Sequence, residues 1–407
     1  MPRGVTPAVS AVRGSIRAMT TPPPPDSPFE VLSVEELRAR SSLKWSRYDP
    51  DVLPLWVAEM DVLPAPEVVE AIVSAARSGD LGYPGQGEFA YAEALAEFAA
   101  ARWGWEVDVA RSVTCADAMS GIGAVLTTAM APAAPVVIPS PVYPPFALFS
   151  SATGRRVVRV GLTDTGRLDL PAIGAALGAE PSFLLLCNPH NPTGAVHTAD
   201  ELRELAEIAK RTGSTVISDE VHGPLVHSSA TFVPWLTVSD HGFAITSAAK
   251  SFNLAGLKAA VILAGAEEGK RLAGLPPATR YGASSLGVIA HAAAYRSAPG
   301  WLDAVNTAIA ANVARLGERL AGALPEIGLT PPEATYLAWL DCTRLGLGDD
   351  PAEAFLRVGR VGLNSGPPFG PGGRGHARIN VACSAAVLDE AIERMAATVA
   401  AGREGRA

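Results

Sequence analysis

The segment 246–258, TSAAKSFNLAGLK, carries two lysines eight residues apart, Lys250 and Lys258. The whole chain has five lysines against 28 arginines, so lysine is a rare choice in this protein. A lysine amine can lose its proton and attack a carbonyl carbon, whereas an arginine side chain stays charged. A single lysine is most often a solvated surface residue, so a reactive role for Lys250 depends on the groups placed around it.

Polar and aromatic residues follow three other apolar segments in the same way. Each has a simple structural interpretation, because Asn-Pro often starts a turn, two adjacent carboxylates often lie in a solvated loop, and a tyrosine often belongs to a core. Taken together with Ser247 and Lys250 after GFAIT, these side chains could form one site. They are Tyr143 after PVVIPSP, Asn188 and Asn191 in FLLLCNPHN, and Asp219, Glu220 and His222 in TVISDEVH.

An aromatic ring, an amide, a carboxylate and a lysine suit one kind of ligand, pyridoxal 5′-phosphate (PLP). A carboxylate beside the pyridine nitrogen keeps that nitrogen protonated and makes the ring an electron sink. An amide can donate to the phenolic oxygen, and an aromatic face can stack on the ring. The lysine amine can bind the aldehyde carbon and later move a proton of the substrate.

The elements that must position these groups are short apolar runs separated by amphipathic segments. Such continuous apolar strands, separated by helices, predict a mostly parallel sheet between helices, an α/β fold. In an open α/β sheet, ligands bind beyond the carboxyl ends of the strands, which is where the polar residues fall. The clearest strands are 134–141, 182–189, 214–220, 242–248 and 259–265, and the clearest helix is 198–213, with Thr198 as N-cap and Gly213 as C-cap.

From about residue 293 the pattern changes to a long helix (301–324), the segment ATYLAWLD, a helix (351–360) and ARINVAC. This order predicts a smaller α+β domain at the C-terminus. The predicted organisation has four parts: a disordered tail (1–28), a segment packing with the small domain (29–60), a large PLP-binding domain (61–292) and the small domain (293–407).

Composition excludes several other classes of protein. Hydrophobic residues make up 48% and charged residues 18% of the 407 residues, which favours a well-cored globular protein. The formal net charge of −8 argues against a nucleic-acid partner. No long apolar run predicts a membrane span. Four cysteines without a CxxC pair are typical of reduced, buried thiols in a cytoplasmic protein and not of a zinc site.

The motifs NPHNPTG, SDE and SAAKSFNLAGLK, in this order, resemble those of the fold-type I PLP enzymes of the class I/II aminotransferase group. The resemblance extends from about residue 30 to 395 and implies that the sheet is of the seven-stranded type. It implies that Lys250 binds the cofactor covalently and that Asp219 pairs with the pyridine nitrogen. Asn191 would contact the phenolic oxygen, Tyr143 would stack on the ring, and His222 stands where many relatives have a tyrosine.

The same resemblance supplies the remaining site residues. The phosphate would lie at the start of a helix in DAMSGIGAVL, at Ser120, Gly121 and Ile122, with Ser247 and Lys258 beside it. Arg378 in GHARINVAC would bind the substrate α-carboxylate. Tyr83 in LGYPGQG matches a tyrosine that relatives contribute across a homodimer interface.

Four further segments resemble the cystathionine β-lyase subgroup of this family, the MalY/PatB-type C–S lyases. They are LPLWVAEMD (53–61), SSLGVIAHAAAY (284–295), WLD (301–303) and PPEATYLAWLD (331–341). The implied reaction is β-elimination from an L-cysteine S-conjugate to a thiol, pyruvate and ammonia. An aminotransferase that needs a 2-keto acid is the main alternative, and a PLP-domain regulator without turnover is a remote one.

Overall fold

The computed structural model describes residues 27–84, 89–131 and 133–404. Within these residues the central sheet has seven strands in the order β2-β8-β7-β6-β5-β3-β4. The strands are β2 (Ser112–Cys115), β3 (Val136–Ser140), β4 (Val157–Gly161), β5 (Phe183–Cys187), β6 (Thr215–Asp219), β7 (Phe243–Thr246) and β8 (Ala260–Ala264). The predicted mostly parallel α/β sheet is therefore confirmed.

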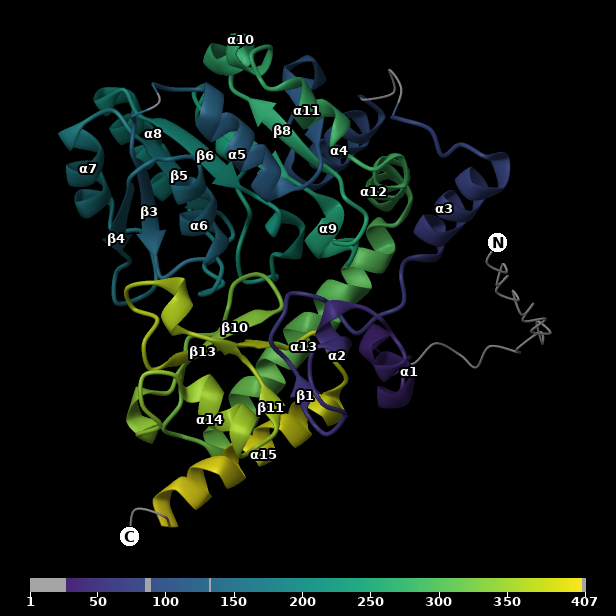
Figure 1. The fold of residues 1–407 in the computed structure, drawn as a ribbon, viewed down its shortest axis with the longest axis vertical. Helices are drawn as coiled ribbons and strands as arrows, with labels where there is room; N and C mark the ends of the chain where they lie inside the picture. The colour runs from purple at the N-terminus through teal and green to yellow at the C-terminus, as the bar shows by residue number, and fades with distance from the viewer. Residues whose placement is uncertain (1–26, 85–88, 132, 405–407) are drawn as a thin grey trace, which may run out of the picture.

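Strand directions decide which loops share an edge of this sheet. β4, β3, β5, β6 and β7 run parallel, and β8 runs antiparallel to both β7 and β2. The carboxyl ends of β2, β3, β5, β6 and β7 consequently meet the start of β8 at one edge. Figure 1 shows this edge facing the lower, yellow-green part of the molecule.

Helices lie on both faces of the sheet or at its edges, and some of them pack only on other helices. They are α3 (Pro66–Ser78), α4 (Phe89–Trp103), α5 (Ala118–Thr128), α6 (Pro145–Ala152), α7 (Leu170–Ala179), α8 (Ala199–Thr212), α9 (Ala248–Ser251), α10 (Gly269–Leu272), α11 (Pro277–Tyr281) and α12 (Ser285–Ser297). Along β5 the side chains alternate: Phe183 and Leu185 join the core under α5 and α6, while Leu184 packs with α7 and α8. This alternation explains why the strands read as unbroken apolar runs.

Helix α8 forms as its sequence predicts. The Thr198 hydroxyl accepts from the Glu201 amide, the Glu201 carboxylate accepts from the Thr198 amide, and Gly213 ends the helix with φ 65°. This capping box and left-handed C-cap were both readable from the residue types.

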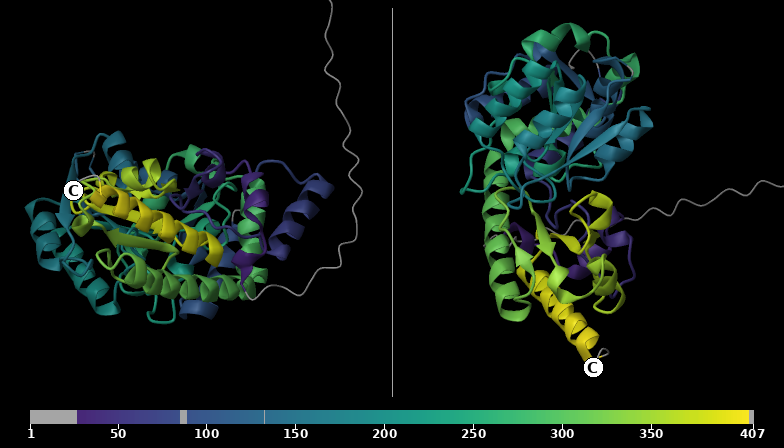
Figure 2. Two further views of the ribbon diagram at one scale, coloured as in Figure 1. Left: turned by 90° about the horizontal axis from the view of Figure 1, so that it is seen from below. Right: turned by 90° about the vertical axis from the view of Figure 1, so that its left-hand side faces the viewer.

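A second, smaller part contains an antiparallel sheet in the order β12-β13-β10-β9. Its strands are β9 (Gly328–Leu329), β10 (Leu337–Asp341), β12 (Asn364–Ser365) and β13 (His376–Asn380), and its helices are α13 (Pro299–Ala323), α14 (Pro351–Arg357) and α15 (Ala385–Glu404). Both views of Figure 2 show the long helices α13 and α15 beside this sheet.

The N-terminal segment lies against the smaller part (Figure 1). It contains α1 (Val34–Arg38), α2 (Leu43–Ser46) and β1 (Leu53–Pro54), and β1 pairs in parallel with β11 (Val361–Gly362). The described residues also contain short 3-10 helices: η1 (Pro28–Glu30), η3 (Val109–Arg111), η4 (Gly223–Leu225), η5 (Trp235–Thr237), η6 (Ala266–Glu268), η7 (Thr343–Leu345) and η8 (Pro367–Phe369).

Some boundaries differ from the predictions. The predicted helix 351–360 ends at Arg357, because Arg360 takes a left-handed φ of 55° that a helix cannot continue. Residues 1–26 of the predicted tail lie outside the described residues, and Pro28 already belongs to η1. The predicted domain boundary at residue 293 falls inside α12, and the division into domains stays a prediction.

Two predictions about composition can also be compared with the structure. All four cysteines, Cys115, Cys187, Cys342 and Cys383, are buried and unpaired, as expected. Across the described ranges, no helix combines the length and apolar character that crossing a membrane requires.

Candidate active site

Residues from several strand ends meet at the edge defined above. Asp219 is the last residue of β6, and Ser247 directly follows β7 and caps α9, which carries Lys250. Asn191 follows β5 and Tyr143 follows β3, and the Tyr143 amide donates to the Asn191 carbonyl at 3.0 Å. The structure therefore brings together the four kinds of group on which the sequence prediction rests.

Lys250 lies on one short helical turn and is only partly exposed. Its Nζ donates to the Ala58 carbonyl at 3.2 Å. Burial, and next the nearby positive charge of Arg378, lower the pKa of the Lys250 amine to about 8. About a tenth of this amine is therefore uncharged at pH 7, far more than for a solvated lysine, and the uncharged form is the one that a nucleophile or a general base requires.

Asp219 is buried, and its Oδ1 accepts only a 3.3 Å hydrogen bond from the Val221 amide. Burial raises the pKa of this carboxyl to about 7. In the part of the chain that the structure describes, no basic side chain forms an ion pair with it. A buried carboxyl of this kind fits a protonated ring nitrogen, which would supply the missing positive charge.

Glu220, the next residue, points elsewhere. Its Oε1 accepts from the Ser218 hydroxyl at 2.9 Å and from the Trp235 amide at 2.7 Å. Burial raises the pKa of Glu220 to about 8. Its carboxylate satisfies two buried donors, so of the two acids of the SDE motif Asp219 is the one left with few hydrogen-bond partners.

Arg378 on β13, in the smaller part of the molecule, contacts Asn191 at the carboxyl edge of the central sheet. Its Nη1 donates to Asn191 Oδ1 at 2.8 Å and its Nη2 to the Trp56 carbonyl at 2.9 Å. The buried Nε has no acceptor among the described residues. Burial lowers the pKa of Arg378 to about 10, which leaves it charged at neutral pH. The arrangement fits a carboxylate ligand.

His222 is buried beside Tyr336, with ring centroids 6.4 Å apart. Burial, followed by the charges of Lys250 and Arg378, lowers the pKa of His222 to about 3, so its imidazole is neutral. Its Nδ1 has no partner among the described residues. A neutral imidazole with a free nitrogen is compatible with the predicted contact to a cofactor oxygen.

The start of α5 differs from the prediction for a phosphate site. The Ser120 amide donates to Asp117 Oδ1 at 2.8 Å and the Gly121 amide to the Asp117 carbonyl at 3.0 Å, so both are already satisfied, and Ile122 is a core residue. Among the described residues, the first-turn amides without an acceptor are those of Ala118 and Met119. The free amides thus lie two residues before the predicted ones, because Asp117, a good N-cap residue, sets the start of the helix.

Gly121 has a packing role instead. A Cβ at this position would lie 3.0 Å from Cys115 Sγ and 3.1 Å from Ile262 Cγ1, so α5 could not approach β8 as closely. Gly121→Ala is therefore expected to lower the free energy of unfolding by about 1–3 kcal/mol. Urea unfolding of the cofactor-free wild-type and variant proteins measures this change in the free energy of unfolding.

Gly123 provides the matched control for that substitution. It lies in the same helix, and a Cβ there would meet nothing within 4 Å. Gly123→Ala is expected to raise the free energy of unfolding by roughly 0.5–1 kcal/mol, because alanine favours the helix. Equal effects at the two positions would contradict the packing role of Gly121.

The other predicted site residues differ in how far they are buried and in what they contact. Lys258, just before β8, pairs with Asp117 Oδ2 at 3.0 Å and is 55% exposed. The buried Ser247 hydroxyl donates to the Ala259 carbonyl at 2.7 Å and accepts from the Ala249 amide. Tyr83 is 89% exposed and has no place in the site of its own chain.

The loop 56–61 is the part of the site that the sequence analysis did not assign. Its sequence was noted as a subgroup feature, but no residue in it was predicted to act. In the structure the Ala58 carbonyl accepts from Lys250 and also from the Tyr336 hydroxyl at 3.0 Å. Backbone groups leave no signal in residue types, so only the structure could place this carbonyl.

The fold and this site define a protein of the aminotransferase class I and II family. The model of that family, described as "Aminotransferase class I and II", matches residues 50–395, and the chain belongs to it.

Among named relatives, the chain is similar to a Mycobacterium leprae protein with the provisional name cystathionine beta-lyase. The two are 45% identical over 393 residues, which covers 91% of this chain and 97% of that protein. Cystathionine beta-lyase of Corynebacterium glutamicum is 34% identical over 90% of this chain and 99% of its own length. A solved structure of the PLP-bound C–S lyase from Staphylococcus hominis aligns with a TM-score of 0.84 and 25% identity, covering 92% and 98% of the two chains.

Proposed function

We propose that this protein is a PLP-dependent C–S lyase that carries out β-elimination on L-cysteine S-conjugates such as L-cystathionine. The observation that carries the proposal is the pair of Lys250 and Asp219 at one sheet edge, an amine with a lowered pKa and a buried carboxyl with a raised one. The choice of reaction within the family is supported by the relatives named cystathionine beta-lyase, which align over nearly the full chain.

The residues fit the cofactor. Asp219 would hold a proton on the ring nitrogen, Asn191 and His222 would contact the phenolic oxygen, and Tyr143 would stack on the ring. The free amides of Ala118 and Met119, with Lys258 nearby, would bind the phosphate at a helix N-terminus. When bound, PLP supplies an electron sink for the pair of electrons left at the substrate Cα.

The protein's own groups account for the other steps. The Arg378 guanidinium binds the substrate α-carboxylate and orients the Cα–H bond toward Lys250. The Lys250 amine takes the Cα proton, the Cβ–S bond breaks, and the thiolate leaves with the bonding electrons. The released aminoacrylate takes up water to give pyruvate and ammonia.

The test is to incubate the pure holoenzyme with L-cystathionine and no keto acid, and to follow pyruvate and free thiol together. Equal and sustained release of both is the expected result. An aminotransferase is the second candidate, because the family includes such enzymes and one relative at 30% identity is named as an N-succinyldiaminopimelate aminotransferase. Amino transfer only after a keto acid is added, without thiol, would select that second function.

The proposal includes a homodimer, in which the exposed Tyr83 of one protomer reaches the site of the other. Sedimentation analysis of the holoenzyme measures the mass of the assembly. The cytoplasmic location predicted from the unpaired cysteines is part of the same proposal.

A further inference from the structure

The loop 56–61, Trp56 to Asp61, has an unusual set of hydrogen bonds. Five consecutive backbone carbonyls each accept at least one bond from a side chain elsewhere in the protein. The donors are Arg378 to Trp56 (2.9 Å), Asn380 to Val57 (2.7 Å), Lys250 and Tyr336 to Ala58 (3.2 and 3.0 Å), Asn380 and Lys44 to Glu59 (2.6 and 3.4 Å), and Asn253 to Met60 (2.9 Å). The position of this loop is therefore set by side chains, in a segment without regular secondary structure.

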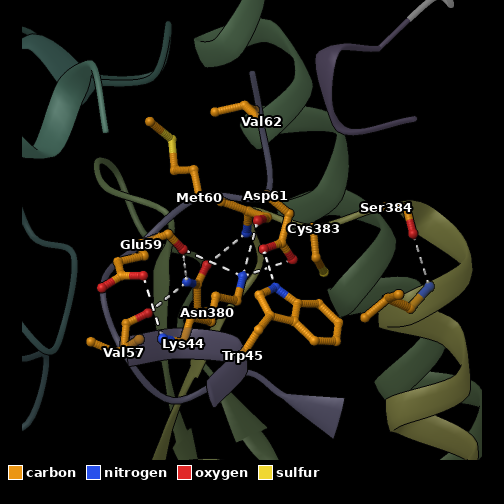
Figure 3. A network of polar contacts seen from close by, with 12 residues as sticks. Lys44, Trp45, Val57, Glu59, Met60, Asp61, Val62, Asn380, Cys383 and Ser384 are labelled. Atoms are coloured by element: carbon orange, nitrogen blue, oxygen red, sulfur yellow. Dashed lines mark hydrogen bonds and ion pairs between the residues drawn. The ribbon is translucent and has the colours of Figure 1, made fainter. Parts of the chain in front are cut away.

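The far end of the loop is held by a buried ion pair, shown in Figure 3. Lys44 Nζ lies 2.8 Å from Asp61 Oδ2, and both side chains are 1% exposed. The other carboxylate oxygen, Oδ1, accepts from the Trp45 indole N–H at 2.7 Å. The Asp61 amide donates to the Ala382 carbonyl at 3.0 Å, which ties this end of the loop to the segment after β13.

The geometry around Lys44 explains why a lysine stands here in a chain that strongly prefers arginine. An ammonium group has three donors on one compact centre. Lys44 Nζ lies close to three oxygens from three different residues: Asp61 Oδ2 at 2.8 Å, and the carbonyls of Glu59 and Ala382 at 3.4 Å each. The planar fork of an arginine does not match such an arrangement.

A buried ion pair is weak evidence for a contribution to stability, because removing both charges from water costs about as much as their attraction returns. Replacing such a pair by apolar side chains is often tolerated. Its clearest use is to fix one geometry. Here the geometry that it fixes is that of the loop, three residues away from the carbonyl that holds Lys250.

We propose that the buried Lys44–Asp61 pair is a positioning device for the reaction at Lys250, an inference that rests on the proposed function. The pair locks the loop 56–61 so that the Ala58 carbonyl, fixed on one side by the Tyr336 hydroxyl, holds the Lys250 amine in line for attack on the cofactor aldehyde. In the described residues, Ala58 is the one hydrogen-bond acceptor that Lys250 Nζ has. A shift of the loop therefore moves the amine or releases it.

The attack provides a direct measurement. The Lys250 nitrogen forms a C=N bond to the aldehyde carbon of PLP and water leaves, which gives a visible absorbance band. Pyridoxine 5′-phosphate has the same ring and phosphate but no aldehyde, so it binds to the cofactor-free protein without this step. The rate of covalent capture and the affinity for the aldehyde-free analogue thus separate positioning of Lys250 from general damage to the site.

The test compares wild-type protein with the double variant Lys44→Met/Asp61→Leu, which removes both charges. We expect covalent capture of PLP to slow by about tenfold, since misplacing a reacting group by a fraction of an ångström has effects of this size. The affinity for pyridoxine 5′-phosphate should stay at the wild-type value. The control is Arg315→Met/Asp389→Leu, which removes a partly exposed pair between α13 and α15 and should leave both quantities unchanged.

Unchanged capture in Lys44→Met/Asp61→Leu overturns the proposal, and so does an equal loss of capture and of analogue affinity, which indicates a structural role only. If this double variant shows no cooperative unfolding transition, the single variant Trp45→Phe takes its place in the test. It keeps both charges and removes the indole donor to Asp61, together with part of a buried ring that also contacts Arg38. Slower capture with unchanged analogue affinity supports the proposal, whereas wild-type capture overturns it. A wild-type protein that does not take up PLP contradicts the proposed function instead.

Discussion

Replacing Lys250 with alanine is expected to lower kcat for β-elimination by about 10³- to 10⁴-fold, the range that a positioned proton-transfer group contributes. The substitution removes both the amine that binds the aldehyde and the base that takes the Cα proton. It should leave the backbone in place, because α9 is capped by the Ser247 hydroxyl and not by the lysine side chain. Borohydride reduction of the PLP-loaded protein, followed by mass spectrometry of the peptide around residue 250, reports the covalent link.

Lys258→Ala is the matched control for this prediction. Lys258 lies near the same edge of the sheet but is 55% exposed and pairs with Asp117. Its loss should weaken cofactor affinity and leave the covalent link at residue 250 intact. A cofactor adduct in Lys250→Ala, or one that maps to Lys258 in the wild-type protein, would show that the two lysines have been assigned to the wrong roles.

Asp219→Asn should have opposite effects on activity and on stability. An amide cannot keep a proton on the ring nitrogen by charge attraction, so kcat is expected to fall by about 10²- to 10³-fold, as when a preorganised electrostatic partner is removed. The cofactor-free variant, however, no longer has to bury a carboxylate. Its free energy of unfolding at pH 8 should exceed that of wild type by up to about 4 kcal/mol.

The pH dependence of this difference follows from the raised pKa of Asp219. The ordinary Asp pKa is 3.8, and burial raises the folded-state value to about 7. Below pH 3.8 the carboxyl is protonated in both states and costs nothing. Between these two values the unfolded chain releases the proton and the folded protein keeps it, so wild-type stability falls as pH rises. The advantage of Asp219→Asn should therefore be absent at pH 3.5 and complete above pH 7.

Urea unfolding of both cofactor-free proteins at pH 3.5 and pH 8 measures this difference. For the effect on kcat, Glu220→Gln serves as the control, because Glu220 is also buried but bonds to Ser218 and Trp235. It is expected to keep kcat close to the wild-type value. A large loss of kcat in Glu220→Gln would mean that the second carboxylate of the motif is the functional one.

The sequence was most informative where residue type and chemistry coincide. Lys250 could be picked out because lysine is rare in this chain, and Asp219 and Asn191 because polar groups directly follow apolar strands. The capped helix α8 was equally predictable, since each cap is a local choice of residue. These features depend on interactions within a few residues, which a linear pattern records.

Predictions were weaker where backbone N–H groups, and not side chains, are the groups available to bind a ligand. Asp117 satisfies the amides of Ser120 and Gly121, so the amides available for an anion are those of Ala118 and Met119. Any residue type supplies the same N–H group, so the motif could not fix the offset. Gly121 was predicted to lie at the phosphate, and the structure shows in addition that its lack of a side chain allows close packing of α5 on β8.

By itself, then, the sequence determined the α/β architecture, the family, and the side chains proposed to carry the reaction, because these follow from hydrophobic period and from functional groups. Only the tertiary structure decided how distant segments meet. It placed the Ala58 carbonyl against Lys250, brought Arg378 to Asn191 across 187 positions, and buried Lys44 against Asp61. Such contacts are set by how the two sheets and the N-terminal segment pack on one another, and packing across long sequence separations is not encoded in any local pattern.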